Sequence, residues 1–176
     1  MKLRPKPELF IFNLYCLNSR TITINAVNEV LHMIEIPFKL IELEHENYHI
    51  LLEGMFSDGT TANWIIDTGA SKSVLDVNLT SFFEKTESEN EDDYQSAGIN
   101  QGMTETSVGR MFHLQFGSLI ISDHKVALID LDHVNEIYGK YTSYRIAGLL
   151  GGDILMHYRC TIDYSTQTIC FRNSYE

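Results

Sequence analysis

The sequence predicts a single domain built mostly of β-strands, and three observations support this fold class. The chain has 176 residues, about the length of one domain, and its 44% hydrophobic content is sufficient for a sizeable core. Short segments with alternating or continuous apolar residues recur along it, as strands do. Turn residues separate these segments, with no interdomain linker and no internal repeat. A series of short strands of this kind is typical of a β-barrel or a β-sandwich.

The first 35 residues have mixed patterns, and we treat them as an extension of unknown role. Residues 21–24 alternate as in a strand, whereas residues 26–36 have a weak helical spacing. The apolar segment 9–17 follows three basic residues and has the length of a signal-peptide core. Prolines and polar residues interrupt this region, and no small-residue cleavage site follows it. We therefore expect a cytoplasmic protein, with export as the alternative.

Three predicted strands lead to the first candidate site. They lie near residues 40–43, 48–56 and 61–66, separated by a polar turn and by the hairpin signal Ser-Asp-Gly-Thr at 57–60. The third strand runs directly into an aspartate, Asp67. Burying an ionised carboxylate is costly unless hydrogen bonds compensate, so an aspartate at the end of a core strand indicates chemistry.

The two residues after Asp67 suit a tight turn. Thr68 can form hydrogen bonds with neighbouring backbone groups, and Gly69 permits a sharp bend and a close approach by another chain. The structural alternative is an Asx-turn that only closes the strand.

Further along the chain, strands continue and one segment is strongly acidic. Residues 84–93 contain six acidic residues and one basic residue, which predicts a solvated loop. Glycines in residues 96–110 predict a mobile hairpin. The remaining predicted elements are strands at 111–116, 119–121 and 125–131, a tyrosine-rich connection at 138–145, and a final hairpin at 160–171.

Paired glycines follow a second apolar segment near the C-terminus. Leu149 and Leu150 precede Gly151 and Gly152, which predicts a tight turn out of a buried strand. Asp153 then stands where it could cap a short helix that begins at Ile154.

The overall charge narrows the class of partner. The formal net charge of −11 disfavours nucleic acid and anionic membrane surfaces. No apolar segment approaches the roughly 20 residues of a membrane-spanning helix.

Residues 45–49 match the zinc-protease pattern His-Glu-x-x-His, but their context contradicts it. That chemistry requires both histidines on one face of a helix. Here the pentapeptide lies between two strand patterns, where His45 and His49 would be about 13 Å apart at about 3.3 Å per residue. We therefore expect no metal and no cofactor.

Two motifs together resemble a known family. Asp67-Thr68-Gly69-Ala70-Ser71, followed about 80 residues later by Leu149-Leu150-Gly151, resembles the retropepsin-like aspartic proteases. The continuation Gly-x-Asp-Ile-Leu and then Thr-Ile-Asp-Tyr is most similar to small bacterial members with one Asp-Thr-Gly per chain. The resemblance covers residues 36–172. It implies a closed, mostly β barrel with one short helix after the Leu-Leu-Gly motif, an extension over 1–35 and a tail over 173–176.

The resemblance also implies roles for individual residues. Asp67 would be the catalytic carboxylate, Thr68 would bond across to a partner subunit, and Gly69 would line the floor of the cleft. Gly151 and the two preceding leucines would support Asp67 from behind. Residues 97–103 occupy the place of the family's flap. The implied substrate-binding positions are Ala70, Ser71, Ala97, Gly98, Ile99, Leu149 and Leu150.

This chain departs from the retroviral members after the last glycine of the motif. It has Gly152 and Asp153 where they carry arginine and then asparagine, and this removes an intersubunit salt-bridge element.

Aspartic protease chemistry uses two carboxylates that share a proton. This sequence contains one Asp-Thr-Gly and no Asp-Ser-Gly, so we expect a homodimer in which two Asp67 side chains meet on the two-fold axis. We expect an aspartic-type endopeptidase that hydrolyses peptide or protein substrates with water activated between these carboxylates. The alternatives are a non-catalytic peptide-binding or dimerisation module on the same fold and, third, a zinc peptidase through His45, Glu46 and His49.

Overall fold

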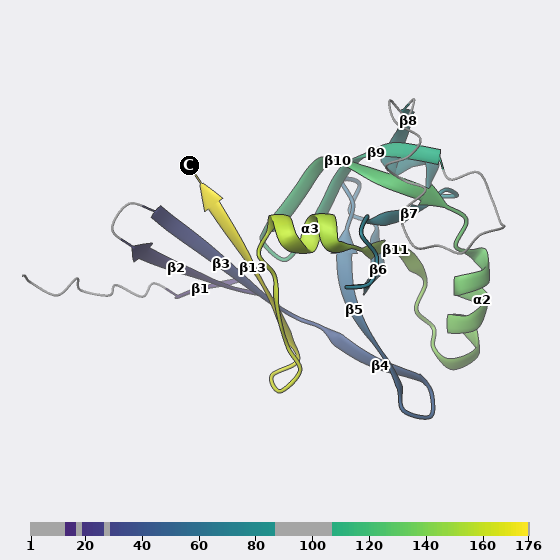
Figure 1. Ribbon diagram of the computed structural model, residues 1–176, viewed down its shortest axis with the longest axis horizontal. Helices are drawn as coiled ribbons and strands as arrows, with labels where there is room; N and C mark the ends of the chain where they lie inside the picture. Colours follow the sequence, from purple (N-terminus) through teal and green to yellow (C-terminus); the bar gives the residue numbers. More distant parts are fainter. Residues whose placement is uncertain (1–12, 17–18, 27–28, 87–106, 176) are drawn as a thin grey trace, which may run out of the picture.

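The computed structural model describes residues 13–16, 19–26, 29–86 and 107–175, and the fold is mostly β, as predicted (Figure 1). The described strands form two sheets, one of five strands and one of eight. Two α-helices accompany them in the described part of the chain, α2 (Asp132–Tyr141) and α3 (Gly152–His157). Neither has the length and apolar character needed to cross a bilayer.

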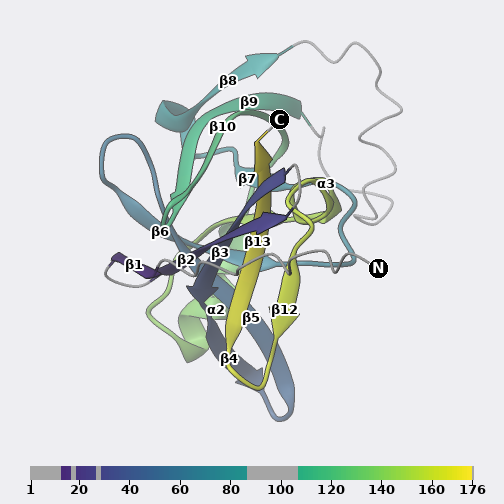
Figure 2. The same ribbon diagram turned by 90° about the vertical axis from the view of Figure 1, so that its left-hand side faces the viewer.

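The five-stranded sheet combines the first three strands of the described chain with its last two. Its strands pair in the order β1-β2-β3-β13-β12, and Figure 2 shows β3, β13 and β12 next to one another. Ile34 and Ile36 of β3 lie opposite Phe171 and Ile169 of β13, and all four side chains are buried. The strands are β1 (Asn13–Cys16), β2 (Ser19–Ala26), β3 (Glu29–Pro37), β12 (Thr161–Asp163) and β13 (Thr168–Tyr175).

This sheet corrects the weak helical spacing assigned to residues 26–36, because residues 29–37 form strand β3. Strand β3 pairs with β2 on one side and with β13 on the other, so its backbone hydrogen bonds are made across the sheet. The expected boundary between residues 35 and 36 falls inside β3, and residues 173–175 belong to β13. The division into extension, domain and tail stays a prediction.

The eight-stranded sheet carries the two motifs. Its strands pair in the order β4-β5-β6-β11-β7-β10-β9-β8, and one further pairing joins β5 to β9 at Met55 and Gln115. The short 3-10 helix η1 (Thr80–Phe82) precedes β8. The strands are β4 (Lys39–Glu44), β5 (Asn47–Met55), β6 (Thr61–Ile66), β7 (Val74–Asp76), β8 (Phe83–Thr86), β9 (Ser107–Phe116), β10 (Leu119–Ile129) and β11 (Ile146–Leu150).

Two predicted loops contain regular structure. Residues 84–86 of the acidic segment lie in β8, where Glu84 is the register partner of Arg110 of β9. Residues 87–93 lie outside the described residues. The tyrosine-rich connection at 138–145 begins inside α2, whose Val134, Ile137 and Tyr138 pack with the residues around β11. That apolar face is short, so its helical spacing is weak in the sequence.

The main core combines residues of both sheets, and aromatic residues of the eight-stranded sheet are prominent in it. Trp64 of β6 is fully buried and contacts the rings of Phe56 and Phe116. A second cluster packs α2 against β11 through Tyr138 and Ile146. Asn135 of α2 stabilises this packing through two hydrogen bonds. Its side-chain amide donates to the carbonyl oxygen of Ile146 and accepts from the N–H of Ile146.

Candidate functional site

Asp67 lies immediately after β6, in a turn that its own carboxylate stabilises. The Oδ1 atom accepts hydrogen bonds from the backbone N–H groups of Gly69 (2.9 Å) and Ala70 (3.2 Å). The N–H of Asp67 donates to the carbonyl oxygen of Leu150 at 3.0 Å. The carboxylate is half-buried, whereas Thr68 and Gly69 are exposed. The Asx-turn expected as a structural alternative is therefore present, and it holds this carboxylate at the protein surface.

Strand β11 supports the turn from behind because it lies between β6 and β7. Leu149 and Leu150 pair with Ile65 and Ile66 in the parallel direction, and β11 also pairs with β7 in the antiparallel direction. Gly148 is needed at this crossing, since a Cβ atom there would lie 2.2 Å from the carbonyl oxygen of Val74. Strand β11 can pass this close to β7 and to Trp64 of β6 only because position 148 has no side chain.

The turn between β11 and α3 holds the chain that follows Asp67. A Cβ atom on Gly151 would lie 2.5 Å from the carbonyl oxygen of Lys72, so this glycine also permits close backbone contact. The N–H of Gly152 donates to the carbonyl oxygen of Ala70 at 2.7 Å, and the N–H of Asp153 donates to that of Ser71 at 3.2 Å. The two motifs that identify the family resemblance therefore touch through their backbones.

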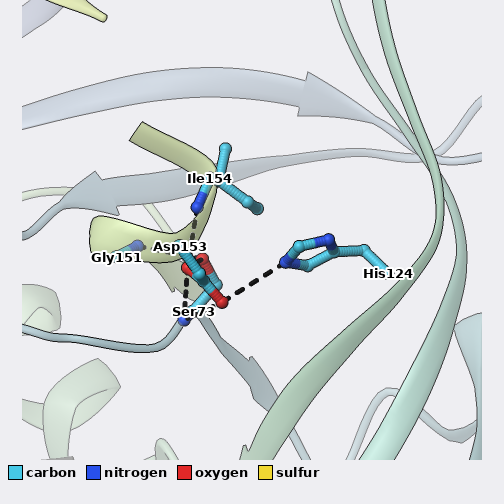
Figure 3. Close-up of polar contacts among 5 residues, drawn as sticks. All are labelled: Ser73, His124, Gly151, Asp153 and Ile154. Carbon is cyan, nitrogen blue, oxygen red and sulfur yellow. Dashed lines mark hydrogen bonds and ion pairs between the residues drawn. The ribbon is translucent and has the colours of Figure 1, made fainter. Parts of the chain in front are cut away.

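A partly buried carboxylate, that of Asp153, extends this contact (Figure 3). It accepts hydrogen bonds from the hydroxyl of Ser73 (2.7 Å), from the N–H of Ser73 (3.0 Å) and from the N–H of Ile154 (2.8 Å). The Nε2 atom of His124 on β10 lies 3.3 Å from the other oxygen, and the N–H of Gly151 donates to the Ser73 hydroxyl at 2.9 Å.

The environment of Asp153 favours its ionised form. Burial alone would raise the pKa of the carboxyl, but the hydrogen bonds from His124, Ser73 and Ile154 outweigh this effect and lower the pKa to about 2. The expected role as a helix cap at Ile154 is corrected, because α3 begins at Gly152 and its N-cap is Gly151. Ser73 and His124 were not singled out in the sequence, where neither residue shows a pattern linked to Asp153.

A cavity of about 620 Å³ opens beside Asp67 and Thr68. Its walls are mainly aliphatic side chains from β4, β5, β6, β11, β12 and α2, and the exposed residues Tyr48 and Tyr164 also line it. Its aliphatic lining residues are Leu43, Ile50, Ile65, Ile66, Val134, Ile137, Leu149 and Ile162.

One wall of the cavity contains a polar pair. The hydroxyl of Tyr138 lies 2.7 Å from Nδ1 of His49, and burial raises the pKa of Tyr138 to about 12. This tyrosine therefore remains protonated at any physiological pH and keeps its hydrogen-bonding capacity.

The predicted substrate-binding residues occupy different environments. Leu149 lines the cavity, whereas Leu150 is fully buried behind Asp67. Ala70 is buried within the turn, and Ser71 is exposed beside it. The three flap positions Ala97, Gly98 and Ile99 lie outside the described residues.

The residues of the zinc-protease pattern do not form a helix. His45 lies in the turn between β4 and β5, with its side chain 93% exposed, and His49 lies on β5 with its ring bonded to Tyr138. Within the described ranges, no group of three or more histidine, cysteine, aspartate or glutamate side chains is arranged to hold a metal ion.

Comparisons with known proteins give two matches. The model of a family described as aspartyl protease matches residues 52–154, which include both Asp67 and the Leu-Leu-Gly motif. Among solved structures, a crystal structure of a retropepsin-like aspartic protease from Rickettsia conorii is similar at 13% sequence identity and a TM-score of 0.44. The similarity covers 86% of this chain and 99% of that one. No curated protein matches this sequence.

Proposed function

Because the chain belongs to the aspartyl protease family, we propose that it is an aspartic-type endopeptidase and that its active species is a homodimer. One observation carries the proposal: the half-buried carboxylate of Asp67 lies at the end of a core strand, beside an apolar cavity. The turn between β11 and α3 supports the loop behind it. The pairing of β5 with β9 also supports the closed barrel that the family resemblance implies.

The proposed reaction uses the Asp67 carboxylates of two subunits. Two carboxylates within a few ångströms of each other share one proton, because both cannot ionise cheaply. The ionised carboxylate accepts a proton from the water that attacks the scissile carbonyl carbon. The protonated carboxylate donates to the carbonyl oxygen, which gives a tetrahedral diol. The amide nitrogen then takes the proton that the first carboxylate received from water, the C–N bond breaks, and the diol returns a proton to the second carboxylate as it becomes the product carboxylic acid.

A second copy of this chain is the simplest source of the second carboxylate. The sequence contains one Asp-Thr-Gly, and a two-fold axis beside Asp67 would bring two identical turns together. Thr68 and Gly69 are exposed on the same turn, so both are accessible to a partner subunit.

The cavity suits an apolar side chain of an extended peptide. Leu149 contributes to its wall, and we place Ala70 and Ser71 beside the substrate backbone, with Leu150 as support. From the family resemblance, we propose that residues 97–99 cover the peptide. Backbone hydrogen bonds would then provide affinity, and the cavity would provide selectivity.

Asp67→Asn tests the catalytic assignment. The asparagine oxygen can still accept the hydrogen bonds of Gly69 and Ala70, so we expect an unchanged fold and loss of peptide cleavage. Cleavage of an unfolded protein is measured between pH 4 and 7, with and without a transition-state mimic of peptide hydrolysis.

The matched control is Asp58→Asn, because Asp58 also accepts a backbone hydrogen bond, from Thr60, in a turn between strands. It should cleave as the parent does. An Asp67→Asn variant as active as the parent would contradict the carboxylate-pair mechanism.

Dilution tests the homodimer. Specific activity should fall as the protein is diluted below its dimer dissociation constant, in parallel with the dimer fraction seen by sedimentation. Activity carried by a monomer would refute the proposal. Peptide binding without cleavage would favour a non-catalytic module, and loss of activity with a chelator would favour a zinc peptidase.

A further inference from the structure

One carboxylate joins three separate segments of the chain. Asp153 stands in the first turn of α3 and binds Ser73, which lies between the Asp67 turn and β7. It also contacts His124 on β10, and Figure 3 shows His124 pointing toward it from a strand on the other side. The partners are far apart in sequence: Ser73 is 80 positions from Asp153, and His124 is 29 positions away.

The hydrogen bonds around this carboxylate form a connected set. The Ser73 hydroxyl donates to Oδ1 of Asp153 and accepts from the N–H of Gly151, so it bridges the two ends of the β11–α3 turn. Ser73 is fully buried, and the Asp153 side chain is 14% exposed. Buried polar groups of this kind are costly unless they are paired, so loss of the carboxylate would leave several donors unsatisfied.

The same turn binds the chain leading back to Asp67. Gly152 donates to Ala70, Asp153 donates to Ser71, and the Asp153 side chain binds Ser73. The turn therefore forms hydrogen bonds with three of the four residues 70–73, which follow Asp67 closely in the chain. The N–H of Ala70 in turn donates to the Asp67 carboxylate. A shift of this segment would move the carboxylate that it helps to orient.

We propose that Asp153, with Ser73 and His124, forms a positioning unit that holds the Asp67 carboxylate in its reactive orientation. The inference rests on the proposed function, since it concerns the same carboxylate. The low pKa of Asp153, about 2, keeps the Asp153 carboxylate ionised at pH 4 and above, the range in which cleavage is to be measured.

The test compares two substitutions at Asp153 with a matched control. Asp153→Ala removes all the bonds of the carboxylate. Asp153→Asn can keep the three donors at Oδ1 and loses the second contact of the Ser73 N–H, which is to Oδ2 at 3.1 Å. Its amide N–H can be directed at Nε2 of His124, which accepts in its Nδ1-protonated form. The control is Asp130→Ala, because Asp130 also links two segments, through Asn78 and the N–H of Asp132, and is exposed.

We expect Asp153→Ala to lower kcat about tenfold or more with little change in KM, since a displacement of about 1 Å in an active site can cost a hundredfold. Asp153→Asn should recover about a third or more of the parental kcat because its oxygen can still accept from the hydroxyl and the N–H of Ser73. Asp130→Ala should have the parental kcat. If Asp153→Ala loses thermal stability but keeps the parental kcat while folded, the positioning role is wrong.

Hydrogen exchange gives a readout that does not depend on activity. In Asp153→Ala, the amides of residues 69–73 should exchange faster than in the parent, while those of β5 and β9 remain unchanged. Uniformly faster exchange would show general destabilisation and contradict the inference. If Asp153→Ala does not fold, the same kcat and exchange measurements are made on Ser73→Ala. This variant removes the hydroxyl that bridges Gly151 and Asp153, and the backbone N–H groups of Ser73 and Ile154 still donate to the carboxylate.

Failure of the inference and failure of the proposed function are distinguishable. If the parent protein does not cleave peptides, the proposed function is wrong, and exchange at residues 69–73 still tests whether Asp153 holds the loop. If the parent cleaves and Asp153→Ala cleaves equally well, only the positioning role is refuted.

Discussion

Gly148→Ala should destabilise the protein strongly, because Gly148 is where β11 crosses between β6 and β7. The added Cβ atom would lie 2.2 Å from the carbonyl oxygen of Val74 and 2.4 Å from Cζ3 of Trp64, whereas ordinary van der Waals contact begins near 3.4 Å. The overlaps are therefore 1.2 Å and 1.0 Å. The carbonyl belongs to the backbone of β7, and the indole is fully buried, so neither can move without disturbing a strand.

The expected cost follows from this geometry. Overpacking a core typically costs about 1–3 kcal/mol, and weakening a hydrogen bond of either strand ladder adds about 1 kcal/mol. We expect the free energy of unfolding to fall by about 3 kcal/mol or more, a large share of the roughly 5–15 kcal/mol of a typical domain. The Asp67 turn should loosen as well, since the N–H of Asp67 donates to Leu150 of the displaced strand.

The matched control is Gly139→Ala in α2. No atom lies within 4 Å of a Cβ built at that position, and alanine in a helix is favoured over glycine by about 0.5–1 kcal/mol. Urea denaturation followed by the fluorescence of Trp64, the single tryptophan, and by circular dichroism gives both free energies. A Gly148→Ala variant within about 1 kcal/mol of the parent would refute the reasoning, whereas one that does not fold in water agrees with it.

Two further predictions concern the hydrogen bonds that Asp153 and Asn135 make on either side of β11. Because the folded-state pKa of Asp153 is about 2, below the ordinary 3.8, its contribution to stability is present above about pH 5 and is lost as the pH falls toward 2. The difference in unfolding free energy between the parent and Asp153→Asn should therefore shrink by about 2 kcal/mol over that range; a difference independent of pH would contradict it. Asn135→Ala leaves the buried N–H and carbonyl of Ile146 unpaired and should cost about 1–3 kcal/mol in urea denaturation. An unchanged midpoint would show that these bonds contribute nothing to stability.

Local sequence patterns predicted the elements whose signals are contained within a few residues. The apolar alternation and the hairpin signal at 57–60 placed a strand at residues 61–66, which are the bounds of β6. The two glycines after Leu150 predicted a tight turn, and the structure has that turn before α3. These signals work because strand alternation and the conformational freedom of glycine are properties of the local chain.

Helix α2 and strand β3 were mispredicted because their conformations depend on distant partners. Asn135 fastens α2 to Ile146, 11 residues away in sequence, and the apolar face of the helix packs against β11. Strand β3 pairs with its neighbour β2 and, on its other side, with β13, whose paired residues lie more than 130 positions later in the chain. Tertiary contacts of this kind override weak local preferences.

The sequence by itself determined the class of fold, the candidate carboxylate and the two motifs that accompany it. Only the tertiary structure decided what holds that carboxylate: the close passage of β11 at Gly148, and the meeting of Ser73, His124 and Asp153. Asp67 is recognisable in the sequence because its neighbours in the chain are also its neighbours in the turn. The positioning unit is not, because its three members come from separate segments and only packing brings them within hydrogen-bonding distance.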